Sequence, residues 1–319
     1  MEYHIEKVIL SIGLPVYNGE NFLAKAIDSI LSQTFTDFEL IIADNGSTDT
    51  TPDICRDFAD RDNRIQLYQS LTNIGAAANF RKVFHLSRGK YFKWAAHDDL
   101  LAPDYLMQCI SLLESRKDII LCHSQVTVID EEGKVIREEK IENMLFDSSD
   151  SSERFSSIIL NDLDNYEVFG VIRRKVLQGT PLIRGFIASD RTLRAELGLR
   201  GKIGIINKPL FLCRDHPQRS IRLMPSHHTR GQWFDPNIKS RFLFPHWRIL
   251  LEYCKCPGRV GLSVTKKIKC YIAALKWVTV HMNWARLIAD PVLVLFPALE
   301  KNLQRIGGLM CKDSKIETP

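Results

Sequence analysis

Two adjacent carboxylates, Asp98 and Asp99, follow an apolar segment that runs from Tyr91 to Ala96. Neighbouring like charges repel each other, and a divalent cation would relieve that repulsion while bridging to phosphate oxygens. An exposed turn, in which solvent screens the two charges, is the structural alternative. Because the approach to the pair is apolar, full exposure is disfavoured, and the sequence favours a metal site here.

A second polar cluster, Asp44 to Asp49, also follows an apolar run. The carboxylate of Asp44 and the amide of Asn45 could bind a base edge or a ribose hydroxyl. Capping of the next helix by Ser47 or Asp49 explains the same residues. Taken alone, the cluster does not separate these two interpretations.

A third cluster, Pro15 to Asn18, ends the first apolar run of the chain. Backbone amides at such a turn can face an anion, and the ring of Tyr17 could flank a planar base. Asn18 could also cap the helix that follows. On its own, this cluster is better explained as a routine connection between a strand and a helix.

Predicted strands and helices alternate over the first 125 residues and place these clusters at strand ends. Short apolar runs bounded by turn residues are typical of parallel strands. These runs are Val8–Leu14, Phe38–Ala43, Ile65–Tyr68, Tyr91–Ala96 and Ile119–Cys122. Apolar residues at helical spacing lie between them, so we predict an α/β fold with right-handed crossovers. Ligands of such sheets bind at the carboxyl ends of the strands.

The chain from residue 126 to residue 232 predicts elements of mixed type. Val126–Asp130 and Val135–Ile136 have the pattern of a hairpin. The polar stretch Met144–Ser157 is predicted to be a surface loop that enters a helix. Asp190–Leu199 is predicted to be a helix and Gly204–Phe211 a strand.

The ordered series of clusters resembles the glycosyltransferases of family 2, which have the GT-A fold. The resemblance is close over about the first 125 residues and rests on Leu14–Asn18, Ser32–Phe35, Phe38–Leu40, Asp44–Asp49, Asn73–Gly75, Gly89–Tyr91, Asp98–Asp99 and Pro103–Asp104. It implies a Rossmann-like, mostly parallel sheet flanked by helices. It also implies an enzyme that transfers a sugar, with inversion, from a nucleotide diphosphate sugar to a carbohydrate or lipid-linked acceptor in polysaccharide or glycolipid biosynthesis. A divalent metal, Mn²⁺ or Mg²⁺, is the implied cofactor.

The resemblance also implies roles for individual residues. Asp99 resembles the metal-contacting residue of the family's DXD-type motif, and Asp190 resembles the base that takes the acceptor's proton. The residues that resemble the nucleotide-sugar site are Pro15, Tyr17, Asn18, Asp44, Asn45, Asn73, Asp98 and His216. A helix N-cap is the alternative for Asp190, and a structural hydrogen-bonded histidine is the alternative for His216. Asn45 stands where the family often has a second aspartate, so the choice of nucleotide stays open.

Three other functional classes fit the sequence less well. A nucleotidyltransferase also uses an α/β sheet and paired acids, but residues 13–15 match its glycine-rich basic loop poorly. A dehydrogenase would need a G-x-G-x-x-G turn, which Gly13 and Gly19 do not supply. A catalytically inactive sugar-nucleotide binding protein is the third alternative, and the presence of Asp99 and Asp190 disfavours it.

The character of the chain changes after about Gln232. We therefore expect a catalytic domain over residues 1–232 and a helical C-terminal extension over residues 233–319 that ends in a loose tail, Lys312–Pro319. Within the catalytic domain, a nucleotide-sugar half spans about 1–125 and an acceptor half about 126–232. The extension has tryptophans among Lys and Arg, and residues 266–278 predict a helix with one apolar and one basic side. Packing of these helices on the catalytic domain is favoured over contact with a membrane surface.

Composition limits the partners and the compartment. The formal net charge is +5, and the first two thirds of the chain lack a dense basic stripe, so no nucleic-acid partner is expected. The 8 cysteines are mostly placed singly inside apolar runs, which is typical of reduced thiols. Neither a signal peptide nor an apolar stretch of about 18 residues is visible. We expect a cytoplasmic protein, located at the inner face of the membrane if the extension binds lipid.

Overall fold

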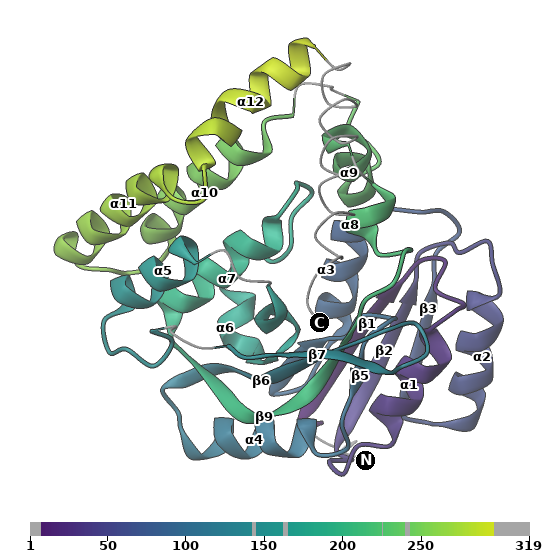
Figure 1. The fold of residues 1–319 in the computed structure, drawn as a ribbon. Coiled ribbons are helices and arrows are strands. Elements are labelled where there is room, and N and C mark those ends of the chain that lie inside the picture. The colour runs from purple at the N-terminus through teal and green to yellow at the C-terminus, as the bar shows by residue number, and fades with distance from the viewer. Residues whose placement is uncertain (1–7, 142–144, 162–164, 225, 240–242, 297–319) are drawn as a thin grey trace, which may run out of the picture.

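The computed structural model describes residues 8–141, 145–161, 165–224, 226–239 and 243–296. Figure 1 shows a curled sheet flanked by helices, with a further group of helices from the C-terminal part of the chain standing beyond it. The strands are β1 (Leu10–Val16), β2 (Phe38–Asp44), β3 (Ile65–Gln69), β4 (Tyr91–Trp94), β5 (Leu100–Leu101), β6 (Ile119–Ile129), β7 (Val135–Glu139), β8 (Val171–Arg173) and β9 (Lys202–Arg214).

Helices connect and cover these strands. They are α1 (Leu23–Leu31), α2 (Thr51–Arg61), α3 (Ala76–Leu86), α4 (Tyr105–Ser115), α5 (Ser151–Leu160), the 3-10 helix η1 (Tyr166–Phe169), α6 (Arg174–Gln178), α7 (Ser189–Arg200), α8 (Ser220–Leu223), α9 (His227–Phe234), α10 (Pro245–Arg259), α11 (Val264–Thr279) and α12 (Asn283–Leu295). The predicted alternation of strands and helices is confirmed over the first 125 residues.

Within the described residues the strands form one sheet in the order β3-β2-β1-β4-β8-β6-β9-β5, with β7 paired to β6. β1 pairs in parallel with β2 and β4, β2 pairs in parallel with β3, and β6 pairs in parallel with β9. The short strands β5, β7 and β8 pair antiparallel with their neighbours. The sheet is therefore mostly parallel, as predicted.

The parallel register brings the ends of three strands to one edge of the sheet. Val16 of β1 lies opposite Asp44 of β2, which in turn lies opposite Gln69 of β3. On the other side of β1, Gly13 lies opposite Trp94 of β4. The polar residues that follow these strands thus emerge at a common carboxyl edge, where ligands of open α/β sheets bind.

Two apolar cores flank the sheet, and the side chains of each buried strand alternate between them. On β2, Leu40 and Ile42 pack in the core that includes residues of α1, α2 and α4. Ile41 and Ala43 point the other way, into the core that includes residues of α3, α6 and α7. Burial on both faces explains why the parallel strands have continuous apolar sequences.

Several predicted boundaries shift in the structure. β1 continues through Pro15 to Val16. β6 is a single strand that contains Ile119–Cys122 and, except for Asp130, the first strand of the predicted hairpin. The polar stretch after residue 144 is a loop only in part, because α5 begins at Ser151, whose side chain is buried. Residues 142–144 lie outside the described residues.

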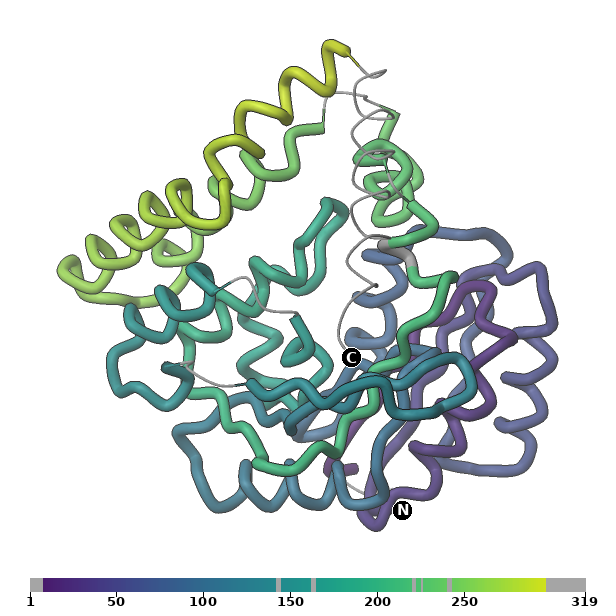
Figure 2. Tube along the Cα trace, in the orientation of Figure 1, coloured from purple at the N-terminus to yellow at the C-terminus, as the bar shows by residue number. Residues whose placement is uncertain are grey.

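The C-terminal helices pack on the side of the molecule formed by α5 and α7. Contacts join α11 to α5 and α10 to α7, and the tube in Figure 2 follows the chain through this group. Tyr253, Cys256, Ala274 and Trp277 from α10 and α11 belong to the apolar core. The predicted packing of these helices on the rest of the protein is therefore observed, whereas the tail Lys312–Pro319 lies outside the described residues. Within the described ranges, no helix combines the length and apolarity needed to cross a bilayer.

Candidate active site

The turn after β1 is fastened to the turn after β2. Asn18 adopts a φ of +49°, its Oδ1 accepts a hydrogen bond from the backbone N–H of Thr48 at 2.9 Å, and its own N–H donates to Oγ of Ser47 at 2.9 Å. The predicted capping of α1 by Asn18 is wrong, because Phe22 is the N-cap and no side chain caps that helix. Tyr17, in the same turn, is 39% exposed and free to meet a planar ligand.

Asp44 and Asn45 are each only 2% exposed, and both organise their surroundings. Oδ1 of Asp44 accepts from the N–H of Ser47 at 3.1 Å. Nδ2 of Asn45 donates to Oδ1 of Asn73 at 2.9 Å, and Oδ1 of Asn45 accepts from the N–H of Ile74 at 2.9 Å. The Asn45 amide therefore ties the loop after β2 to the loop after β3, and its contact with a base edge stays a prediction.

The acidic pair lies against the segment that ends β9. Oδ1 of Asp99 accepts from the backbone N–H of Arg214 at 2.9 Å, and Oδ2 of Asp98 accepts from Nε2 of His216 at 2.9 Å. The Arg214 side chain is almost fully buried; its Nε donates to the carbonyl of Asp98 at 2.9 Å, and its Nη1 donates to two carbonyls of the β6–β7 turn. Arg214 thus clamps the acidic turn in place.

Burial and mutual repulsion give the carboxyl groups of Asp98 and Asp99 different pKa values. Burial, followed by the charge of Asp98, raises the pKa of Asp99 to about 7. Burial also acts to raise the pKa of Asp98, but the hydrogen bond from His216 and the charges of His97 and His216 outweigh it, so the pKa of Asp98 lies below its usual value. The pair therefore combines a more acidic carboxyl group, Asp98, with a less acidic one, Asp99.

This donor set fits a divalent cation. His216 donates a hydrogen bond to one oxygen of Asp98, whereas Asp99 is held by the N–H of Arg214 and by the thiol of Cys213. Carboxylate oxygens of this kind are the ligands that a hard divalent cation prefers. No group of 3 or more His, Cys, Asp or Glu side chains that could hold a metal occurs in the part of the chain that the structure describes. A cation at this turn would therefore complete its coordination with water or ligand oxygens, as Mg²⁺ does at phosphate sites.

The turn after β1 packs directly against the acidic turn. A Cβ atom added at Gly19 would lie 2.7 Å from Cδ2 of His97. The ring of Phe22 lies 4.5 Å from the His216 ring, between centroids, and the guanidinium carbon of Arg214 lies 5.0 Å from the centroid of Phe22. Phe22 was not among the predicted site residues, because an apolar residue at a helix start carries no sequence signal for such a role.

Asp190 lies in the first turn of α7, and Nδ2 of Asn165 donates to its Oδ2 at 2.8 Å. The N-cap alternative is wrong, because Ala188 occupies that position with a φ of +61° and no side chain caps the helix. Asn165 is a further partner that the sequence did not reveal. Among the described residues, no hydrogen bond joins Asp190 to the acidic pair.

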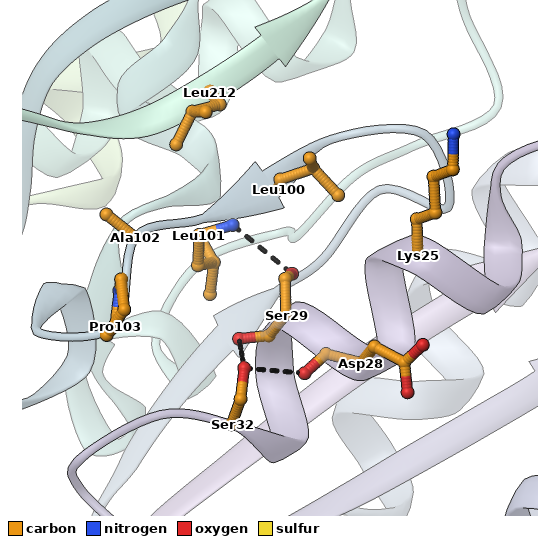
Figure 3. A pocket seen from close by; sticks show the side chains of 9 residues that line it. All are labelled: Lys25, Asp28, Ser29, Ser32, Leu100, Leu101, Ala102, Pro103 and Leu212. Carbon is orange, nitrogen blue, oxygen red and sulfur yellow. Dashed lines mark hydrogen bonds between the residues drawn. The ribbon is translucent and has the colours of Figure 1, made fainter. Parts of the chain in front are cut away.

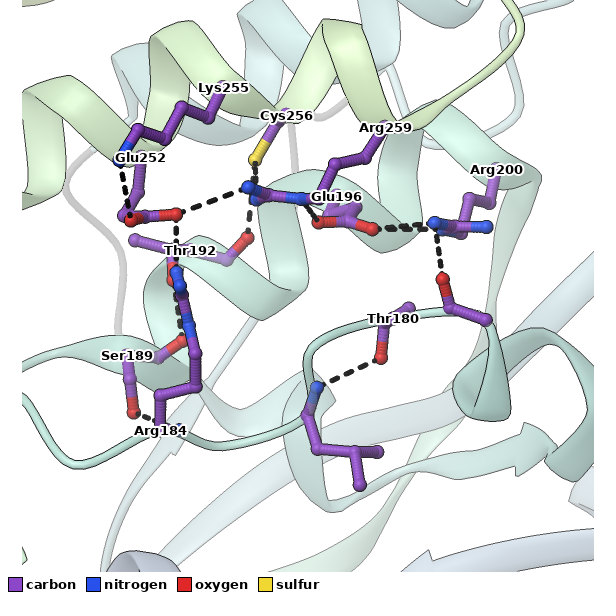
Figure 4. Close-up of polar contacts among 12 residues, drawn as sticks. Thr180, Arg184, Ser189, Thr192, Glu196, Arg200, Glu252, Lys255, Cys256 and Arg259 are labelled. Atoms are coloured by element: carbon purple, nitrogen blue, oxygen red, sulfur yellow. Dashed lines mark hydrogen bonds and ion pairs between the residues drawn. The ribbon is translucent and has the colours of Figure 1, made fainter.

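A buried ionic network anchors the helix of Asp190 to α10 (Figure 4). Glu252 of α10 has a fully buried side chain and pairs with Arg184, in the loop that leads into α7. Arg259 bridges Glu252 at 3.3 Å and Glu196 of α7 at 2.7 Å. The C-terminal helices therefore help to hold the loop from which Asp190 emerges.

A hollow of about 490 Å³ lies beside α1 and β5 (Figure 3). Its wall includes Ser29, whose Oγ accepts from the N–H of Leu101 at 3.2 Å. None of the predicted site residues lines this hollow. It is therefore separate from the site that the sequence predicts.

Comparison with known proteins agrees with this arrangement. The family model described as glycosyl transferase family 2 matches residues 11–179, which is more than half of the chain. That range contains all of β1 except Leu10, together with β2, β4 and the acidic turn. The chain therefore belongs to glycosyl transferase family 2.

Curated relatives match part of the chain. An uncharacterized glycosyltransferase of Rickettsia prowazekii is 36% identical over 123 residues, which cover 38% of this chain and 37% of that protein. An uncharacterized glycosyltransferase of Methanocaldococcus jannaschii is 33% identical over 144 residues, which cover 44% of this chain and 50% of that protein. The matches thus span between about a third and half of the length of these relatives.

Solved structures share the fold at low sequence identity. S. aureus TarS 1-349 in complex with UDP-GlcNAc has a TM-score of 0.63 and 14% identity, covering 88% of this chain and 79% of that chain. The mannosyltransferase PcManGT from Pyrobaculum calidifontis, in complex with GDP-Man and Mn²⁺, has a TM-score of 0.51 and 16% identity, covering 92% of this chain and 88% of that chain. These likenesses extend the shared fold well beyond the range that the family model matches.

Proposed function

We propose that the protein transfers a sugar from a nucleotide diphosphate sugar to an acceptor hydroxyl with inversion of the anomeric centre. The observation that carries the proposal is the half-buried pair Asp98 and Asp99 at the carboxyl edge of the sheet, held by Arg214 and His216. Membership of glycosyl transferase family 2 supports it. Two proteins of the same fold are described in complex with UDP-GlcNAc or GDP-Man, which supports a donor of this class.

For the donor we propose a site along the carboxyl edge of β1, β2 and β4. Tyr17 presents an exposed ring that can flank the base. The proposed site further includes Pro15, Asn18, Asp44, Asn45, Asn73, Asp98 and His216. The hydrogen bonds among Asn18, Asn45 and Asn73 and their neighbours fix the loops before a ligand arrives, which lowers the ordering cost of binding.

For the cofactor we propose Mn²⁺ or Mg²⁺ held through Asp99, with Asp98 beside it. When bound, such a cation would neutralise charge on the departing nucleoside diphosphate. The protein's own part is to keep Asp98 ionised through His216 and to hold Asp99 through the backbone N–H of Arg214. PcManGT, a structural neighbour, is described with Mn²⁺.

For the base we propose Asp190, which would take the proton from the attacking hydroxyl. Asn165 restrains one of its carboxylate oxygens, and the other can face the acceptor. The acceptor itself we place among carbohydrates and lipid-linked sugars, as in polysaccharide or glycolipid biosynthesis. The 7 described cysteines are all free thiols, which supports a reducing compartment such as the cytoplasm.

Thermal shift with a panel of nucleoside diphosphates, each with and without Mn²⁺, tests the donor site. We expect one diphosphate to raise the melting temperature more with Mn²⁺ than without it, because ligands that bind only the native state stabilise it. Asp99→Asn should remove the Mn²⁺-dependent part of the shift. Asp28→Asn, an exposed acid on α1, is the matched control and should behave as wild type. No shift with any diphosphate, with or without Mn²⁺, would refute the proposal.

Turnover with radiolabelled nucleotide sugars tests the chemistry. Asp190→Asn should lower kcat by about 100-fold or more while donor binding stays near wild type, because a general base contributes about 10²–10⁴-fold. Release of pyrophosphate from a nucleoside triphosphate would instead indicate a nucleotidyltransferase. Donor binding without hydrolysis or transfer across a panel of sugars and acceptors would indicate an inactive binding protein.

A further inference from the structure

The outward face of α11 carries an apolar stripe that is exposed to solvent in the described part of the structure. Val264, Ile268, Tyr271, Ile272 and Leu275 are all exposed, and Leu275 is 69% exposed. Four of them follow one another at intervals of four, three and four residues, so they line one side of the helix. An exposed apolar stripe of this length on a regular helix indicates an interaction surface.

Core packing does not account for this stripe. The opposite side of α11 contributes Cys270, Ala273, Ala274 and Trp277 to the core, and these residues are buried. The helix thus has two apolar sides, one against α5 and α10 and one toward solvent. The inward side explains how α11 is held on the protein and leaves the outward side without a partner.

The neighbouring helix α12 repeats the arrangement. Trp284, Ile288, Val292 and Leu295 are exposed and also recur at helical spacing, with Ile288 at 60% exposure. Asn283, Leu287 and Asp290 of the same helix are buried. Figure 1 shows α11 and α12 along one outer margin of the molecule, beyond α5 and α7 and away from the sheet. Contacts join the two helices, so the two stripes lie on adjacent elements.

The charged side chains at the surface of α11 and α12 are all basic. The acidic side chains between Pro245 and Leu295 are Glu252 and Asp290, and both are buried, at 0% and 1% exposure. The basic side chains of α11 and α12 are Lys266, Lys267, Lys269, Lys276 and Arg286. By helical spacing, Lys267 flanks one side of the α11 stripe, and Lys269 and Lys276 flank the other.

Acidic side chains at the start of α5, Asp150 and Glu153, act on Lys269 of α11. Asp150, the N-cap residue of α5, pairs with Lys269 at 2.9 Å and lowers the net positive charge at that end. Lys267 and Lys276 have no ion-pair partner among the described residues. The surface therefore keeps a positive field around its apolar stripes, and a partner must offer both an apolar interior and negative charge.

We propose that the outward faces of α11 and α12 dock in the interface of an anionic lipid bilayer, without crossing it. Helices that lie in this interface bury an apolar face near the acyl chains and place Lys and Arg among anionic headgroups. Tyr271 and Trp284 suit the boundary, because their rings have an apolar body and a polar edge. The inference is independent of the sugar-transfer chemistry.

Co-sedimentation of the full chain with phosphatidylglycerol-containing vesicles, compared with pure phosphatidylcholine vesicles, tests the proposal. We expect binding to the anionic vesicles that weakens at about 0.5 M salt, because salt screens exposed charges. The double variant Leu275→Gln and Ile288→Gln should lose about tenfold or more in affinity, because both side chains would leave the acyl boundary. Val135→Gln, at an equally exposed site on β7, is the matched control and should bind as wild type.

The variants also need to remain folded, which circular dichroism and the nucleotide-dependent thermal shift can establish. Absence of binding to anionic vesicles at low salt would overturn the proposal. Equal binding of wild type and double variant would overturn it as well. A dimer in sedimentation velocity that the double variant dissociates would show that a second copy of this chain covers the surface instead.

Discussion

His216 and Asp98 are joined by a 2.9 Å hydrogen bond across 118 residues of sequence. The imidazole is 2% exposed and lies against the ring of Phe22. Because an ionised carboxylate only accepts hydrogen bonds, Nε2 is the donor, and its proton stabilises the charged form of Asp98. The acidic turn therefore depends on a residue that the chain supplies only after β9.

Removing this donor should weaken cation binding. His216→Phe keeps a ring against Phe22 but removes the hydrogen-bond donor to Asp98. Mn²⁺ affinity in the presence of nucleoside diphosphate should then fall by about 10–100-fold, which is the usual effect of removing a residue that hydrogen-bonds to a metal ligand. Isothermal titration calorimetry measures it. His216→Gln, which retains an N–H donor, should recover part of the affinity, and the exposed His85→Phe should have no effect. Unchanged Mn²⁺ affinity in His216→Phe would show that the hydrogen bond serves packing alone.

Glu252 should be one of the most sensitive positions for stability. Glu252→Gln leaves Arg184 and Arg259 beside an uncharged side chain, and breaking a buried ion pair costs about 3–5 kcal/mol of unfolding free energy. Urea denaturation measures the loss, and exposed Glu138→Gln is the control, expected within about 0.5 kcal/mol of wild type. Because Arg184 lies in the loop before Asp190, kcat should also fall in the surviving folded fraction. A loss below about 1 kcal/mol would contradict the role given to this network.

Lys93 should make stability depend on pH above neutrality. Its side chain is fully buried, its Nζ donates to the carbonyl of Phe169, and burial lowers its pKa to about 7. Between about pH 7 and the unfolded pKa of about 10.4, Lys93 is protonated in the unfolded chain but neutral in the folded protein. The free energy of unfolding therefore rises with pH over this window. Below the window Lys93 is protonated in both states, and its destabilising effect on the folded protein no longer changes with pH.

The variant Lys93→Met tests that sign. Between about pH 7 and pH 9, the free energy of unfolding of the wild type should rise by about 2 kcal/mol more than that of the variant. Denaturation at the two pH values gives the comparison, and exposed Lys25→Met controls for general charge effects. Parallel pH profiles for wild type and Lys93→Met would mean that Lys93 is protonated in both states throughout.

Gly75, in the loop after β3, lies in close contact with the segment at the end of α9. It has a φ of +86°, and an added Cβ would lie 2.5 Å from Cδ of Pro236 and 2.8 Å from the carbonyl oxygen of Phe234. Gly75→Ala therefore combines backbone strain with a clash, whereas Gly133→Ala, at a φ of +93° in open space, has strain alone.

The two alanine variants should differ in thermal unfolding. Gly75→Ala should lower the free energy of unfolding by about 1–3 kcal/mol or more. It should also weaken nucleotide binding, because a displaced backbone at residue 75 would disturb the hydrogen bond from its N–H to Oδ1 of Asn73. Gly133→Ala should lose less and bind nucleotide as wild type. Equal losses in the two variants would indicate that the contact with Pro236 does not constrain the loop.

The strand-end clusters could be predicted because a parallel sheet leaves few choices. Once Val8–Leu14, Phe38–Ala43 and Tyr91–Ala96 are identified as neighbouring buried strands, the residues that follow them must meet at one edge. The sequence could not show that the Asn45 amide turns toward Asn73, since side-chain direction within a loop depends on atoms of other loops.

Contacts between distant segments were also beyond the sequence. The resemblance placed the segment Arg214–His216 near the diphosphate, but it did not show that these residues bond to the acidic turn itself. Nothing in the pattern around Phe22 indicates that its ring lies against them, because such contacts depend on how β9 inserts beside β6. For α11, helical periodicity predicted one apolar and one basic side. The structure shows a second apolar side, because exposure depends on which neighbours actually cover the helix.

The stretch by which the family is recognised ends at residue 179, whereas the groups that grip the acidic pair come from Arg214 and His216. Substitutions after residue 179 can therefore change how the acidic pair is held without altering any residue of the range that the family model matches. A hybrid enzyme made by joining two family members near residue 179 would keep the acidic pair of one parent and take the residues that bond to it from the other. A ribosome must likewise synthesise another 115 residues after Asp99 before that carboxylate can meet its backbone donor.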